Sequence, residues 1–160
     1  MAVDRRHFVT GLLALTAMGA LVVTTAPGEA AKKGAINTIG SPGVAIKGFD
    51  PVAYFKDGKP RRGSKSHTFR YKGAEWRFSS AENKAAFAAN PAKYEPAYGG
   101  YCAYGVASGY LVKIEGDSWA IRNGRLYLNY DRGVQKRWAK NPSGFINKAN
   151  GRWPKLIGGR

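Results

Sequence analysis

The chain contains one cysteine among its 160 residues, and this most constrains how it can fold. A lone cysteine cannot form an intramolecular disulfide, so the fold has to rest on a buried apolar core or on a bound group. About 130 residues remain after a predicted export signal, which is the ordinary size of one domain with a core of its own.

Cys102 lies in residues 98–104, YGGYCAY, where a glycine pair precedes it and three tyrosines surround it. Glycine pairs allow positive φ angles and close backbone approach, so we expect the thiol at a turn and not inside a regular element. Three roles remain open for it: an inert structural thiol, a soft-metal ligand or a redox nucleophile. The residues predicted to line its site are Tyr98, Gly99, Gly100, Tyr101, Tyr104 and Asp50.

Residues 1–30 have the pattern of a twin-arginine export signal. Arg5 and Arg6 precede Phe8 and a short, moderately apolar run over residues 11–23, and small residues follow. The run is shorter than the roughly 20 apolar residues that span a bilayer. We therefore expect a periplasmic protein exported by the twin-arginine route, with an uncleaved membrane anchor as the alternative.

The formal net charge is +16, and the first 30 residues contribute nothing to it because their two basic and two acidic residues cancel. Strong positive charge ordinarily indicates nucleic acid, but an exported protein meets little of it. The expected partners are an anionic membrane surface or an acidic protein.

Residues 31–44 read as an irregular arm because glycine and proline interrupt any periodicity. Residues 67–71 and 75–78 predict a first hairpin, followed by a helix to residue 89 with Ser79 as N-cap and Glu82 completing a capping box. Residues 110–114 predict a strand.

Asn123-Gly124 between two apolar runs predicts a second hairpin over residues 119–129. Asp131 is placed to cap a helix over residues 132–140, and Pro142 to begin a further short helix. We recognise no internal repeat. The pattern predicts a small single α+β domain of short antiparallel hairpins with two or three helices.

Several motifs in order resemble a known family. GFDPVAYF (residues 48–55) and WRFSSAEN (residues 76–83) closely resemble the YHS domain. YGGYCAY (residues 98–104), LYLNY (residues 126–130) and Trp153-Pro154 resemble, more narrowly, the exported YHS-domain (seleno)protein family. The resemblance covers residues 45–157 and implies a YHS-like domain there.

YHS domains are related to small metal-binding modules of copper and mercury handling, whose ligands are thiolates. The matching positions here are Ala53, Ser79, Ser80 and Asn83, so that ligand set is absent. Cys102 and His67 are the remaining candidate metal ligands. In some relatives the position of Cys102 is selenocysteine, which implies a redox or soft-ligand role.

The resulting prediction is an exported, more likely non-enzymatic domain associated with a soft metal, copper first, or serving as a redox accessory through Cys102. A thiol-dependent oxidoreductase or peroxide sensor is one alternative, in which Cys102 would be the catalytic residue. A basic envelope-binding module with no chemistry at Cys102 is the other.

Overall fold

The structure, a computed structural model, describes residues 34–158, and the predicted export signal lies outside them. They form one small α+β domain, as the sequence predicts, with six α-helices and two two-stranded antiparallel sheets. None of the helices within this range is long and apolar enough to cross a membrane.

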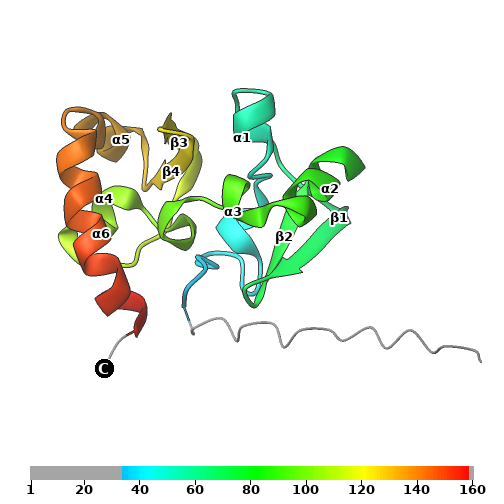
Figure 1. The fold of residues 1–160 in the computed structure, drawn as a ribbon, viewed down its shortest axis with the longest axis horizontal. Helices are drawn as coiled ribbons and strands as arrows, with labels where there is room; N and C mark the ends of the chain where they lie inside the picture. The colour runs from blue at the N-terminus through cyan, green and yellow to red at the C-terminus, as the bar shows by residue number, and fades with distance from the viewer. Residues whose placement is uncertain (1–33, 159–160) are drawn as a thin grey trace, which may run out of the picture.

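The elements follow one order twice along the chain (Figure 1). A 3-10 turn, a short helix, a hairpin and two further helices make up each half. The first half contains η1 (Ala45–Gly48), α1 (Ala53–Lys56), β1 (Ser64–Tyr71), β2 (Ala74–Phe78), α2 (Ala81–Ala89) and α3 (Pro91–Tyr94). The second contains η2 (Ala97–Gly100), α4 (Ala103–Ser108), β3 (Glu115–Arg122), β4 (Arg125–Asn129), α5 (Arg132–Ala139) and α6 (Pro142–Gly158).

The spacing between equivalent elements is nearly constant. Helices α2 and α5 begin 51 residues apart, and so do α3 and α6, each of which starts at a proline. The asparagines before these prolines, Asn90 and Asn141, both accept a hydrogen bond from the backbone N–H three residues ahead. The sequence shows no repeat because the halves share few identical residues, and what they share is the order and spacing of their elements.

Both predicted hairpins are present. The turn residues Lys72 and Asn123 have φ angles of 48° and 50°, and each is followed by a glycine with positive φ. This left-handed pair of turn residues matches the twist of the two strands it joins. Residues 34–44, the described part of the predicted arm, contain no helix or extended strand.

Three local predictions need correction. The N-cap of α2 is Ser80, whose side chain accepts from the Asn83 N–H, because the Ser79 hydroxyl is already hydrogen-bonded to Asp50. Residues 110–114 are not a strand, since the ladder between β3 and β4 ends at Glu115 and Asn129 and offers them no partner. Helix α6 runs for 17 residues instead of ending early, because its apolar face continues to Trp153 and Leu156.

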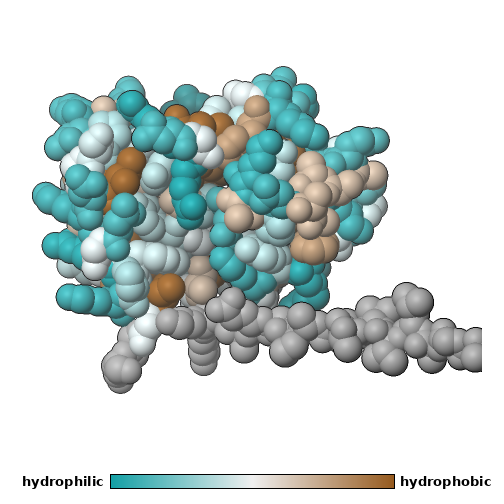
Figure 2. All heavy atoms as spheres, viewed as in Figure 1, coloured by the Kyte–Doolittle hydropathy of each residue, from teal (hydrophilic) through white to brown (hydrophobic). Residues whose placement is uncertain are grey.

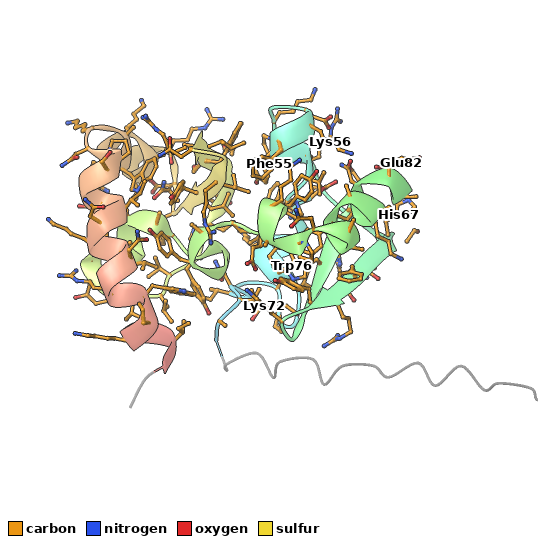
Figure 3. The ribbon with its side chains drawn as sticks, in the orientation of Figure 1. Phe55, Lys56, His67, Lys72, Trp76 and Glu82 are labelled. Carbon is orange, nitrogen blue, oxygen red and sulfur yellow. The ribbon has the colours of Figure 1, made fainter. Side chains whose placement is uncertain are left out.

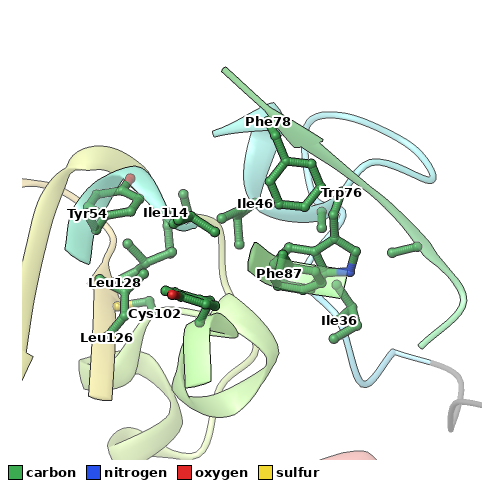
Figure 4. Close-up of a cluster of buried hydrophobic side chains, with 14 of the residues drawn as sticks. Ile36, Ile46, Tyr54, Trp76, Phe78, Phe87, Cys102, Ile114, Leu126 and Leu128 are labelled. Carbon is green, nitrogen blue, oxygen red and sulfur yellow. The ribbon is translucent and has the colours of Figure 1, made fainter. Parts of the chain in front are cut away.

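The main core joins the two halves (Figure 4). Trp76, Phe78 and Phe87 of the first half are fully buried in the same cluster as Leu126 and Leu128 of β4. A second cluster, with Tyr98, Tyr127 and Trp138 buried in it, lies against α6. Burying one large apolar side chain stabilises the fold by about 1.5–3 kcal/mol, so this shared core explains the single domain without disulfides.

Candidate functional site

Cys102 is the N-cap of α4, at the end of the turn formed by η2. Its Sγ accepts a hydrogen bond from the Gly105 N–H at 3.3 Å. The thiol donates to Asn129 Oδ1 at 3.6 Å, and the same oxygen accepts from the Tyr104 N–H at 3.2 Å. Cys102 is only 1% exposed. The prediction that the thiol lies at a turn is confirmed, and its contacts join the start of α4 to the end of β4.

Burial raises the pKa of the Cys102 thiol, and the N–H groups of Gly105, Tyr130 and Tyr104 offset this only in part. The nearby Asp131 carboxylate raises the pKa further. No basic residue in the described part of the chain offsets this, because the thiol's surroundings are apolar and its charged neighbour is acidic. The thiol is protonated at neutral pH, so it is a weak nucleophile and a poor metal ligand in this geometry.

The three tyrosines near Cys102 bond to other partners. Tyr98 donates its hydroxyl hydrogen to Asn150 Oδ1 at 2.8 Å on α6, and Tyr101 donates to the Ile36 carbonyl at 3.4 Å. The ring of Tyr104 packs on Phe145, with ring centroids 5.0 Å apart. Within residues 34–158 these side chains brace the second core cluster and do not form a ligand set around the sulfur.

The glycine pair has the conformational role that the sequence indicates. Gly99 and Gly100 have φ angles of 58° and 82°. A Cβ at Gly99 would overlap the Ala35 carbonyl oxygen, and one at Gly100 would overlap the Ile46 side chain. Asn37 holds this close approach, because its N–H donates to the Gly99 carbonyl at 2.9 Å and its Nδ2 to the Gly100 carbonyl at 3.0 Å.

His67 is not brought to Cys102. It is half-buried on β1, on the side of the molecule away from α4 (Figures 1 and 3). Within residues 34–158 no group of three or more His, Cys, Asp or Glu side chains is placed to hold a metal ion. The two predicted metal ligands therefore do not share a site in the described part of the chain.

Asp50 is fully buried and braces the first half. Its Oδ1 accepts from the Val52 and Ala53 N–H groups at 2.8 and 3.2 Å. Its Oδ2 accepts from the N–H and hydroxyl of Ser79 at 2.8 and 2.7 Å, and from Asn83 Nδ2 at 2.8 Å. Through these bonds Asp50 braces the turns before α1 and α2. The bonds belong to the starts of α1 and α2, so the structure does not place Asp50 in the lining of the thiol site.

Comparison with known proteins does not add to this picture. No protein-family model matches the chain, and no curated protein or solved structure is significantly similar to it. The resemblance to the YHS domain rests on the motifs quoted above and stays a prediction.

The structure reveals a cationic surface on α5 and α6. From Arg132 to the end of the chain there are eight basic residues and no acidic one. All seven of those in the described range are exposed. We call the following residues the cationic face: Lys136, Arg137, Lys140, Lys148, Arg152 and Lys155.

On α6, Lys148, Arg152 and Lys155 are spaced i, i+4 and i+7, which places them along one side of the helix. Figure 2 shows hydrophilic side chains along this edge of the molecule. Elsewhere, carboxylates neutralise basic residues, for example Lys72 with Glu95 and Arg77 with Glu75. The cationic face has no such ion pair among residues 34–158. In the sequence, the cationic face is indicated by the absence of Asp and Glu after Asp131.

Proposed function

We propose that this protein is an exported, non-catalytic domain that binds anionic lipid surfaces of the cell envelope through its cationic face, while Cys102 serves as an internal helix cap. The observation that carries the proposal is the run of exposed, unpaired basic side chains on α5 and α6. It corresponds to the envelope-binding alternative of the sequence analysis. The periplasmic location and the twin-arginine route are part of the same proposal, supported by the pattern of residues 1–30.

The expected binding is electrostatic. Each Lys or Arg near an anionic membrane surface contributes about 1 kcal/mol, and this contribution falls off within a Debye length of about 8–10 Å. Among residues 34–158 the large exposed apolar side chains are Ile39, Tyr110 and Tyr130, none of them on α5 or α6. We therefore expect the protein to lie on the membrane surface without inserting into it, and to be released by added salt.

The test is cosedimentation with vesicles of phosphatidylglycerol and phosphatidylcholine, compared with pure phosphatidylcholine. The variant K140Q/K148Q/K155Q removes three charges from the cationic face. The variant K56Q/K59Q/K65Q removes three equally exposed charges from the first half. None of these six lysines takes part in an ion pair within the described range, so neither variant disturbs the fold through a broken pair.

We expect wild type and K56Q/K59Q/K65Q to bind anionic vesicles and K140Q/K148Q/K155Q to lose about tenfold or more in affinity. Neutral vesicles bind none of the three proteins. Equal losses in both variants would show that net charge matters and the cationic face does not. No binding to anionic vesicles by wild type would reject the lipid surface and leave an acidic protein as the partner to seek.

A function of the thiol is the second candidate, and one observation favours it. The Gly105 N–H donates to the sulfur and would stabilise a thiolate once formed. Copper binding, a redox accessory role or peroxide sensing would each require this buried group to become exposed. Cu(I) titration against a competing chelator tests it, with Cys102→Ala beside wild type: tight one-to-one binding lost in the variant supports the candidate, and equal weak binding rejects it.

A further inference from the structure

A cavity of about 370 Å³ opens between η2, β4 and α6. Its lining contains three aromatic rings, one guanidinium and one amide: Ala97, Tyr98, Arg125, Tyr127, Asn150 and Trp153. This volume falls in the range of small-molecule sites.

The rings form a connected wall. Tyr98 packs against both Tyr127 and Trp153, with ring centroids 6.1 and 5.8 Å apart. Tyr127 is fixed in turn by the fully buried Trp138 at 5.3 Å. Tyr98 and Tyr127 are buried and Trp153 is partly buried, so the parts of these rings that line the cavity are held in place by the core.

The polar groups of the lining are donors and a cation. The Tyr98 hydroxyl donates to Asn150 Oδ1, which occupies the amide oxygen and leaves Asn150 Nδ2 as a donor. Arg125 is exposed and makes no ion pair among residues 34–158. Burial raises the pKa of Tyr98, so its ring stays neutral and adds no negative charge. A guanidinium and an amide N–H are both donors to which a carboxylate can bind.

The first half shows that the fold does not require this cavity. By the 51–52 residue spacing, Ala97, Tyr98, Arg125 and Tyr127 correspond to Ala45, Ile46, Ala74 and Trp76. Those four residues are at most 1% exposed, and they belong to the main core cluster together with Ile36 from the arm. Ala97, Tyr98 and Tyr127 are also buried, so the two halves differ at these positions mainly in the exposed Arg125, which stands where the first half has Ala74.

We propose that this cavity binds a small aromatic carboxylate, with its ring against Tyr98, Tyr127 and Trp153 and its carboxylate toward Arg125 and Asn150. Asn150 and Trp153 lie on a different line of α6 from Lys148, Arg152 and Lys155, so this site uses none of the cationic face. The inference is independent of the proposed membrane binding.

The test is titration of the purified protein with benzoate, followed by the backbone and indole N–H signals in two-dimensional NMR. Acetate supplies the charge without the ring, and benzyl alcohol the ring without the charge. We expect saturable shifts at the Trp153 indole and the Asn150 amide with benzoate, at least tenfold weaker binding of both fragments, and unchanged binding by K140Q/K148Q/K155Q.

Arg125→Gln should weaken benzoate binding about tenfold, because a charge-assisted hydrogen bond is lost. Arg122→Gln, at the far side of the same hairpin turn, is the matched control and should bind as wild type. Both side chains are exposed, so neither change threatens folding. Shifts away from the cavity, equal binding by Arg125→Gln, or no saturation at about 10 mM benzoate would each overturn the proposal.

Discussion

Cys102 and Asp50 occupy equivalent positions in the two halves of the molecule. Each follows by two residues a glycine with positive φ, Gly48 at 78° and Gly100 at 82°, and each accepts a hydrogen bond from the N–H three residues ahead. Each is also bonded to a side chain at the end of its own hairpin, Asp50 to Ser79 and Cys102 to Asn129. The thiol therefore stands where the other half has a structural cap, and this equivalence favours a structural role for it.

Asp50→Ala should lower the free energy of unfolding by about 3 kcal/mol or more, because it leaves the buried donors of Val52 and Asn83, and the part-buried donors of Ser79, without an acceptor. Ser79→Ala removes one of these donors and should cost about 1 kcal/mol. Urea denaturation followed by circular dichroism measures both. Equal costs for the two variants would contradict the bracing role of Asp50.

Gly99→Ala should destabilise the protein by more than Gly124→Ala. Both glycines have positive φ, so both variants incur about 1–2 kcal/mol of backbone strain. Only the Cβ at Gly99 meets the Ala35 carbonyl oxygen, whereas at Gly124 nothing lies within 4 Å. Comparing the Tm of the two variants separates the backbone strain, which both share, from the clash with the Ala35 carbonyl oxygen, which only Gly99→Ala has. A Tm for Gly99→Ala at or above that of Gly124→Ala would show that the arm does not pack on this turn.

Because the pKa of Cys102 is raised in the folded protein, we expect the free energy of unfolding to fall at alkaline pH. The unfolded chain loses the thiol proton near the ordinary value of 9.0, while the folded chain retains it, so folding stability falls as pH rises above 9.0. Tyr54, Tyr98 and Tyr101 act in the same direction from their ordinary value of 10.0 upward.

The control for this prediction is Cys102→Ser, which keeps a capping oxygen and has no group that ionises in this range. The difference in unfolding free energy between wild type and Cys102→Ser should shift against wild type as pH rises from about 8 to about 10. A difference that stays constant, or that shifts in favour of wild type, would mean that the folded thiol ionises as readily as the unfolded one.

The sequence predicted those features that depend on local chemistry. Asn123-Gly124 determines a left-handed turn by itself, and Asp131 caps α5 through the Val134 N–H as expected. The N-cap of α2 was assigned one residue early because Ser79 and Ser80 are both good caps. Only the contact of Ser79 with Asp50, 29 residues away, decides between them.

The site depends on side-chain directions and on contacts between distant residues, which a single sequence does not reveal. Tyrosines and a thiol adjacent in sequence point in different directions, because η2 turns the chain between Tyr98 and Cys102. The cavity brings Tyr98, Arg125 and Trp153 together from three elements. Asp50 and Cys102 are recognised as equivalent because each follows a glycine with positive φ, and the residue types alone do not reveal this angle.

The measurement that tests the central claim most directly is the reaction rate of Cys102 with Ellman's reagent in the native protein. If the thiol is an internal cap, its reaction is slower than that of a free thiol by about 1000-fold or more, and it speeds up with urea as the structure opens. A native rate close to that of an exposed thiol, unchanged by low urea concentrations, would contradict the account and show that Cys102 is a reactive thiol.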